Sequence, residues 1–383
     1  MISSYAQTNP TIYGIGSVKM SGPKAAEFGC KKVLIVTDDG VTKAGIVDKV
    51  KESLDAAGVR YAVFDKVPQD PPDYIVNEGG EFARSEKVDG IVAVGGGSPM
   101  DAAKAINVLI NNPLPISQYY ASMDYKPGVP IILIPTTAGT GSENTTIAVI
   151  TDTKNHVKTA VFLNATLAIL DPELTVTLDP EYTVMTGMDA FAHAAESLTT
   201  GNPNPRSEVL AYDAIKRIVK NLPAAFADGS DIRARSNLMI ASNFAGIAFN
   251  DALVHLGHAV AHAVGATFHL IHGNVCALAL PEVMIYASKV VPDKVKLVGS
   301  AMGISFNENE TPEETGEKVA AEIRKFIKNL GIKSFSQLGI SKNELVDLAD
   351  KVTNDACFNY IPKKLTLKEV ADMLEKMYDN YVL

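Results

Sequence analysis

A carboxylate and an imidazole stand four residues apart in the stretch GMDAFAHAAES, residues 187–197. The other side chains of this stretch are mostly small or apolar, which predicts a buried helix. At this spacing Asp189 and His193 lie on one face of the helix. A buried helix that carries both groups side by side needs an explanation, and metal ligation is one.

Histidines are concentrated in HLGHAVAHAVGATFHLIHG, residues 255–273, which holds five of the seven in the chain. A lone histidine on an apolar face is usually a core residue, but five so close together are hard to explain in that way. His258 and His262 are four apart and share a helical face. We expect Gly265 to end or bend this helix, so that His272 follows the break.

Oxygen and imidazole ligands together suit a divalent metal ion. Asp189 and His193 would supply part of such a site, and the histidine-rich segment the rest. Cysteine is absent from residues 255–273, which argues against a structural zinc site of the cysteine type. Spacing alone does not decide which histidines bind, because His255, His258 and His262 all fit one face.

Two small-residue loops follow buried apolar runs in the first half of the chain. In AVGGGSPMDAAKAI (93–106), three glycines precede a predicted helix, so the backbone N–H groups can approach a pyrophosphate. The motif is not G-x-G-x-x-G, and a tight strand-to-helix turn is the alternative. PTTAGTGSE (135–143) adds hydroxyl groups after a second strand, which favours a nucleotide site.

A third polar turn, VTDDG (36–40), places Asp38 and Asp39 after another predicted strand. A carboxylate here would accept hydrogen bonds from an adenosine ribose and repel a 2′-phosphate. The alternative is a solvated turn.

The elements that must position these residues change character along the chain. Strands and helices alternate over the first half, with strands expected at 31–36, 61–67, 89–94 and 129–135. This order predicts an α/β, Rossmann-like domain with a parallel sheet covered by helices. Helical periods dominate after LDPEYT (178–183), with no strong strand signal beyond about residue 180. We therefore expect two domains, 1–179 and 180–383.

Composition narrows the function classes. The chain has 383 residues, 46% hydrophobic and 21% charged, with a net charge of −9 and no run of Lys and Arg, which argues against a nucleic-acid partner. Its apolar runs are too short to cross a bilayer, and MISSYAQTNP does not resemble a secretion signal. Three widely spaced cysteines favour a reducing, cytoplasmic location.

Four motifs together, GGGSPMDAAK, PTTAGTGSE, TGMDAFAHAAES and HAVAHAVGATFHLIHG, resemble the iron-containing (group III) alcohol dehydrogenases, in consistent order over the whole chain. The resemblance implies a dehydroquinate synthase-like architecture: an NAD-binding domain (1–179), an all-helical metal-binding domain (180–383) and a site in the cleft between. It implies that the metal ligands are Asp189, His193, His258 and His272. His262 would lie near the nicotinamide and serve the proton relay.

The resemblance also implies the cofactor and substrate contacts. Asp38 matches the position that favours NAD over NADP, whereas Asp70 stands where relatives often have Asn. Phe249 and Cys357 match positions that line the substrate pocket, but the loop 354–364 around Cys357 departs from the family pattern. The remaining cofactor-binding residues would be Gly95, Gly96, Gly97, Ser98, Asp101, Thr136, Thr137, Thr140, Val149 and Lys158.

The function implied is hydride transfer between NAD(H) and a small primary alcohol or diol and its aldehyde, at an Fe²⁺ centre with Zn²⁺ as the alternative, in a homodimer or larger homo-oligomer. A cyclase or lyase of the dehydroquinate synthase type would need several cations for its phosphorylated substrate, and 187–199 and 249–273 contain no Lys or Arg. A non-catalytic protein that binds metal and nucleotide is the third hypothesis. His255 and His269 match no family ligand and are expected to line the cleft or support the ligands.

Overall fold

The computed structural model describes Tyr5, residues 9–155 and residues 157–381. The chain divides into two compact units, one formed by Gln7–Leu178 with Gly229–Met239 and the other mainly by Asp179–Asp228 and Ile240–Leu383. The segment Gly229–Met239 joins the first unit although it lies far along the chain. Arg235, which is buried, donates hydrogen bonds to the backbone oxygens of Gly229 and Leu178, and a sequence pattern does not reveal this link.

Six parallel strands form the main sheet of the first unit, in the order β1-β8-β5-β4-β2-β3. A separate antiparallel hairpin pairs β6 with β7. The strands are β1 (Thr11–Tyr13), β2 (Lys32–Val36), β3 (Arg60–Phe64), β4 (Gly90–Gly95), β5 (Ile131–Pro135), β6 (Ile147–Asp152), β7 (Val157–Phe162) and β8 (Leu167–Leu170).

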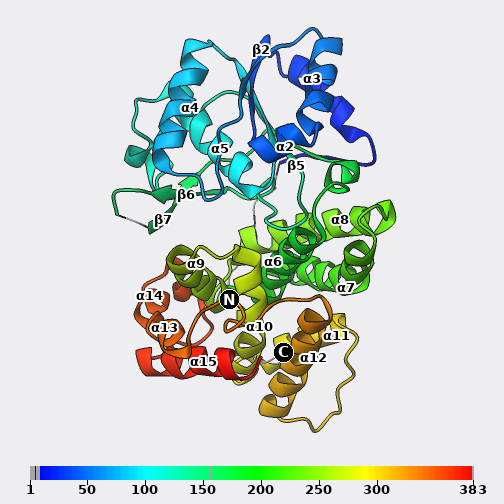
Figure 1. Cartoon of the computed structure of the whole chain (residues 1–383), viewed down its shortest axis with the longest axis vertical. Coiled ribbons are helices and arrows are strands. Elements are labelled where there is room, and N and C mark those ends of the chain that lie inside the picture. The colour runs from blue at the N-terminus through cyan, green and yellow to red at the C-terminus, as the bar shows by residue number, and fades with distance from the viewer. Residues whose placement is uncertain (1–4, 6–8, 156, 382–383) are drawn as a thin grey trace. The chain divides into compact units, whose positions relative to one another are not determined.

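Helices cover both faces of this sheet, because successive residues of each strand point to opposite sides. Ile91 and Ile131 pack in the core beneath α4 and α5, whereas Val92 and Ile132 pack in the core beneath α1 and α3. Figure 1 shows α4 and α5 on one side of β2 and α3 on the other. The helices of this unit are α1 (Ser21–Glu27), α2 (Asp39–Lys43), α3 (Ile46–Ala56), α4 (Asp73–Ser85) and α5 (Gly97–Asn111), with 3₁₀ turns η1 (Ser17–Met20), η2 (Ile116–Tyr119) and η3 (Pro172–Thr175).

The second unit is helical. Its central helix, α10, packs against α6, α9 and α12, so nearly every side chain of α10 is buried. The helices are α6 (Pro180–Thr199), α7 (Pro205–Ala227), α8 (Ile232–Ala252, shared between the units), α9 (Leu256–Phe268), α10 (His272–Ser288), α11 (Pro292–Ala301), α12 (Pro312–Asn329), α13 (Lys342–Val346), α14 (Ala349–Thr353) and α15 (Leu367–Asp379), with the 3₁₀ turn η4 (Ala356–Tyr360).

The predicted fold class is confirmed: a parallel sheet with helices comes first, and the described residues beyond β8 form helices and no strand. Gly265 does not end its helix, because α9 continues through it to Phe268 and His269 ends the helix in a left-handed conformation. The interval before His272 is therefore only residues 269–271. None of the described helices is long and apolar enough to cross a membrane.

Candidate metal centre and cofactor loops

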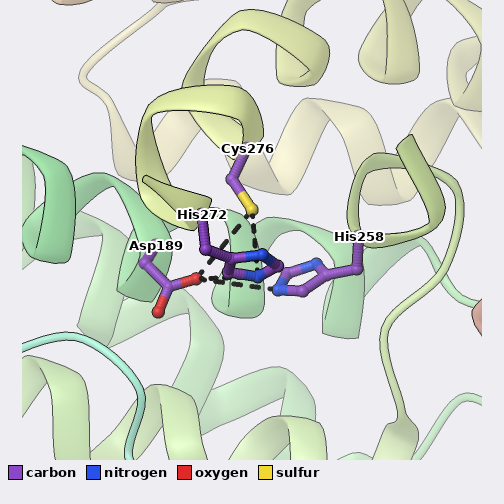
Figure 2. Close-up of side chains that lie close together, drawn as sticks. All are labelled: Asp189, His258, His272 and Cys276. Carbon is purple, nitrogen blue, oxygen red and sulfur yellow. Dashed lines mark hydrogen bonds and ion pairs between the residues drawn. The ribbon is translucent and has the colours of Figure 1, made fainter. Parts of the chain in front are cut away.

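The four predicted metal ligands lie around one carboxylate oxygen. Asp189 and His193 come from α6, His258 from α9, and His272 is the first residue of α10. Measured from Asp189 Oδ1, the Nε2 atoms of His272, His258 and His193 are 3.6, 3.8 and 3.9 Å away. Figure 2 shows Asp189, His258 and His272 pointing toward one another. The helices thus bring together residues 83 positions apart in the chain, while their binding of a metal stays a prediction.

Aromatic stacking holds the ring of His193. It lies between the rings of Phe249, with centroids 4.4 Å apart, and His258, with centroids 4.6 Å apart. Phe249 comes from α8, so a fourth helix takes part in positioning these side chains. The predicted pocket residue therefore lies directly against a predicted ligand.

Glu196, a fully buried carboxylate on α6, connects the start of α9 to His258. It accepts hydrogen bonds from the backbone N–H groups of His255, Gly257 and His258, so it caps α9 in place of a side chain from that helix. Burial by itself would raise the pKa of Glu196, but the imidazoles of His255 and His258 and the N–H of Gly257 lower it to about 2. Glu196 is therefore ionised and can only accept hydrogen bonds.

The ionised Glu196 fixes the tautomer of His258. His258 Nδ1 lies 2.6 Å from Glu196 Oε2 and must carry the proton of that hydrogen bond. The other ring nitrogen, Nε2, lies 3.8 Å from Asp189 Oδ1 and is buried without a hydrogen-bond partner among the described residues. A buried ring nitrogen beside a carboxylate oxygen fits a bound cation, since ligating histidines commonly have a carboxylate on their other nitrogen.

Glu196 was not identified from the sequence, although it lies in the stretch that carries Asp189 and His193. Its spacing of seven residues from Asp189 places it on the same helical face, which was the available signal. His255, expected to line the cleft or support the ligands, is fully buried behind Glu196, and its Nε2 lies 2.9 Å from Thr199 Oγ1. His269 ends α9.

His262 has a different carboxylate partner. His262 Nδ1 lies 3.0 Å from Oδ2 of Asp355, the residue just before η4. The side chain of His262 is 23% exposed. Burial by itself would raise the pKa of Asp355, but the hydrogen bond and charge of His262 lower it below its ordinary value. Cys357 belongs to the same small cluster, and its backbone N–H donates to Asp355 Oδ1.

The two glycine-containing loops of the first unit pack against each other. Gly96 is the N-cap of α5, and no side chain caps the first N–H groups of this helix. Thr136 N–H donates to the backbone oxygen of Gly95 at 2.9 Å. A Cβ on Gly97 would lie 2.8 Å from Thr140 Cγ2, and one on Gly96 would lie 3.5 Å from Thr137 Cγ2. The loops therefore place the free N–H groups of a helix beside threonine side chains, which suits a phosphate group.

Asp101 and Val149 take part in a hydrogen-bond network that holds the second loop. Asp101 Oδ1 accepts from the Ser142 hydroxyl at 2.6 Å and Oδ2 from the Val149 N–H at 3.0 Å. Lys104, fully buried on α5, donates to the Ser142 hydroxyl and to the Ile147 carbonyl. One polar network thus joins α5, the second loop and β6. This network would act on a bound cofactor indirectly, by holding the two loops in place.

The remaining cofactor candidates are Asp38, Asp70, Ser98 and Lys158. Asp38 Oδ1 accepts from the Val41 N–H, so Asp38 is the N-cap of α2. Lys158 on β7 forms an ion pair with Asp70 at 2.7 Å, and the Asp70 N–H donates to Ser98 Oγ at 3.3 Å. Asp70, Ser98 and Lys158 are therefore neighbours. Their contacts with a cofactor stay predictions.

Comparison with known proteins covers nearly the whole chain. Residues 8–172 match the family described as iron-containing alcohol dehydrogenase, and residues 183–378 match its C-terminal family. An NAD-dependent methanol dehydrogenase of Bacillus methanolicus is 34% identical over 95% of this chain and 97% of its own. A choline dehydrogenase of Bacillus subtilis (strain 168) is 37% identical over 90% of this chain and 88% of its own.

The chain belongs to the iron-containing alcohol dehydrogenase family. A solved structure of a 1,3-propanediol oxidoreductase has a TM-score of 0.95 at 33% identity, covering 99% of this chain and 100% of the other. Whether Asp189 and the histidines around it hold the metal of this family stays a prediction.

One residue of this member of the family was missed by the sequence analysis. Cys276 Sγ lies 3.5 Å from His272 Nε2 and 3.9 Å from Asp189 Oδ1. Cysteine is absent from residues 255–273, as stated above, but Cys276 lies just beyond that segment and enters the same cluster (Figure 2). Its spacing of four residues from His272 was the signal, because α10 presents both on one face.

Proposed function

We propose that the protein interconverts small primary alcohols, or diols, and their aldehydes, with NAD(H) as the hydride carrier and a divalent metal, iron or zinc, at the centre. The observation that carries this proposal is the convergence of Asp189, His193, His258 and His272, in a chain of this dehydrogenase family. His258 Nε2, buried without a hydrogen-bond partner among the described residues, is the atom that most directly fits a cation.

The ligand set of one carboxylate and three imidazoles would hold either Fe²⁺ or Zn²⁺. When bound, such a cation acts as a Lewis acid on the substrate oxygen, and the nicotinamide takes or gives the hydride. Glu196 keeps the His258 ring in the tautomer that can bind. The stacked rings of Phe249 and His258 keep the His193 ring in place.

His262 is the group that we assign to proton transfer. Its Nδ1 is held by Asp355, which fixes the ring and leaves Nε2 to exchange a proton with the ribose hydroxyl or with water. Its ring stacks on that of His272 at a centroid distance of 5.4 Å, so the proton carrier lies next to the proposed ligands. The partial exposure of His262 agrees with a residue that passes protons onward.

The substrate that we infer is small and uncharged. Phe249 and Cys357 would form apolar parts of its pocket, and 187–199 and 249–273 contain no Lys or Arg to bind a phosphate. Relatives are named for methanol, choline and 1,3-propanediol, so the family does not fix the alcohol. A cytoplasmic location and a homodimer or larger assembly belong to the same proposal, and light scattering of the purified protein tests the assembly.

The experiment is a turnover assay on protein purified without oxygen, with its metal content measured. Oxidation of NADH should depend on a short aldehyde, stop when a chelator removes the metal, and return with Fe²⁺ or Zn²⁺. Metal-loaded protein that turns over no alcohol or aldehyde would contradict the proposal and favour the non-catalytic alternative.

Cofactor choice is tested at Asp38. A carboxylate there disfavours the 2′-phosphate of NADPH, so the wild-type protein should prefer NADH. Asp38→Asn keeps a good N-cap for α2 but removes the charge, and should narrow the ratio of kcat/KM for NADH and NADPH by about tenfold, which corresponds to about 1.4 kcal/mol of lost repulsion. A wild-type protein that uses both equally would contradict this assignment.

A further inference from the structure

We propose that Cys276 is an additional ligand of the metal centre, so that its sulfur binds the same cation as Asp189 and the histidines. The inference deepens the proposed function and rests on it, because it concerns the metal that the dehydrogenase site would hold. The metal ligands implied by the family resemblance include no sulfur, and this ligand follows from the position of Cys276 in this chain.

The separations of Cys276 Sγ from its neighbours are those expected between two ligands of one ion. Bond lengths of about 2.3 Å from zinc to sulfur and about 2.1 Å from zinc to nitrogen put the two atoms about 3.6 Å apart at a tetrahedral angle. The distance from Cys276 Sγ to His272 Nε2 is 3.5 Å, and to Asp189 Oδ1 it is 3.9 Å. One ligand atom from each of Asp189, His258, His272 and Cys276 lies within 4.8 Å of all the others.

The Cys276 side chain is held within the packed helices. Cys276 is fully buried one turn after His272, on the face of α10 that meets α6 and α9. Those helices carry Asp189 and His258, and Figure 2 shows the sulfur directed toward the three other side chains. The sulfur therefore remains beside the site in any arrangement that keeps these helices packed.

A second observation, independent of the cysteine, indicates that this cluster binds a cation. His258 Nε2 is buried and makes no hydrogen bond among the described residues, while Glu196 holds the other ring nitrogen, Nδ1. A buried ring nitrogen without a hydrogen-bond partner, next to a carboxylate oxygen, is a position where a positive ion would be stabilised. The sulfur lies in the same group of atoms.

Binding exchanges the thiol proton for the cation. The S–H bond breaks, a metal–sulfur bond forms, and the proton leaves to solvent, as a coordinating thiol is deprotonated. A thiolate favours Zn²⁺ and related borderline ions over the oxygen-preferring Mg²⁺ and Mn²⁺. The alternative is that Cys276 only donates a weak hydrogen bond to His272 and never reaches the metal.

Cobalt reports directly on sulfur, because a Co²⁺–thiolate bond gives a near-ultraviolet charge-transfer band that nitrogen and oxygen ligands do not give. The wild-type protein, stripped of metal and reloaded with Co²⁺ without oxygen, should show this band at a measured cobalt content near one per chain. Cys276→Ser should lose the band. Cys357→Ser and Cys30→Ser are the matched controls and should keep it, since Cys357 belongs to the His262 cluster and Cys30 to the other unit.

The outcomes separate this inference from the proposed function. If the wild-type protein binds cobalt but shows no charge-transfer band, Cys276 is not a ligand, although the metal centre itself is supported. If the wild-type protein binds no cobalt, both the Cys276 ligand and the proposed metal centre are contradicted. Loss of the band in Cys357→Ser instead of Cys276→Ser also overturns it. Should Cys276→Ser not fold, X-ray absorption of the zinc-loaded wild-type protein decides: a zinc–sulfur distance of about 2.3 Å is expected, and a shell of nitrogen and oxygen alone contradicts it.

Discussion

His258 and His262 differ in their hydrogen-bond partners although they lie one helical turn apart. Glu196 from α6 holds His258, and Asp355 next to η4 holds His262. His258 is buried and faces Asp189, whereas His262 is partly exposed. Spacing treats the two alike because both partners come from distant parts of the chain. Spacing therefore pointed to both histidines without separating them, the family resemblance implied different roles, and the fold shows the different contacts on which such a difference would depend.

Substitution of each histidine should separate metal binding from proton transfer. His258→Ala removes a proposed ligand and should empty the centre, with loss of turnover. His262→Ala should retain most of its metal and lose activity by about 10–100-fold with an altered pH–rate profile, because it supports the reaction without holding the ion. The metal content and the kcat of both variants measure whether the two roles are divided in this way. Metal-free His262→Ala beside metal-loaded His258→Ala would reverse the two roles.

Glu196 should matter for metal affinity although it is not among the proposed ligands. Glu196→Gln keeps the shape but loses the charge that fixes the His258 tautomer and caps α9, so we expect metal affinity to fall by about 10–100-fold. The free energy of unfolding should drop by about 2 kcal/mol, the value of a hydrogen bond to a charged group. Competition with a chelating dye measures the first and urea unfolding the second.

Glu282→Gln is the matched control for Glu196. Glu282 is also a buried carboxylate, but its side-chain partners among the described residues are Arg324 and Asn380, and not a histidine. Its loss should lower stability and leave metal affinity unchanged. Equal metal affinity in Glu196→Gln and the wild-type protein would remove Glu196 from the site.

At the scale of elements, buried apolar runs gave the central strands and helical periods gave the helices of the second unit. β1 was missed because three residues are too few to show a period of two, and the β6–β7 hairpin and β8 were not identified either. Gly265 was misread because a glycine is a weak helix breaker when packing holds the helix, and α9 is buried on most of its surface. Local pattern thus predicts element type better than element ends.

Two glycines near the proposed ligands should respond oppositely to alanine. A Cβ on Gly273 would lie 1.9 Å from the Met185 carbonyl oxygen, so Gly273→Ala should push α10 from α6, cost about 1–3 kcal/mol of stability and lower metal occupancy. A Cβ on Gly265 would lie 3.6 Å from its nearest atom, an ordinary contact. Gly265→Ala should therefore stabilise α9 by about 0.5–1 kcal/mol and serve as the control.

Thermal or urea unfolding with parallel metal analysis measures both glycine variants. A Gly273→Ala protein with wild-type stability and metal content would show that α6 and α10 can separate without disturbing the centre.

At the scale of the whole molecule, neutral acids that are buried or partly buried in both units make the native state hold protons more tightly than the unfolded chain. Burial raises the pKa of Cys30 in the first unit to about 11. Burial likewise raises the pKa of Tyr286 and of Tyr381 in the second unit to about 12. In the unfolded chain these thiol and phenol groups ionise at about 8.5 and 10. The protein should therefore lose stability on the alkaline side.

Tyr381 gives this alkaline dependence a single-residue test. Its hydroxyl donates to the Ile332 carbonyl at 2.7 Å, so Tyr381→Phe should cost about 1 kcal/mol at pH 8. In the wild-type protein, the contribution of Tyr381 is fully present below about pH 10, where the phenol is neutral in both states. It declines as pH rises toward the folded pKa of about 12, because the unfolded state ionises first.

Phenylalanine does not ionise, so the difference in unfolding free energy between the wild-type protein and Tyr381→Phe should narrow as pH rises from 8 to 11. Urea midpoints at several pH values measure it, with Tyr74→Phe, a residue 60% exposed, as the control that should show no such change. A difference that stays constant to pH 11 would mean that the native state does not hold the Tyr381 proton more tightly than the unfolded chain does.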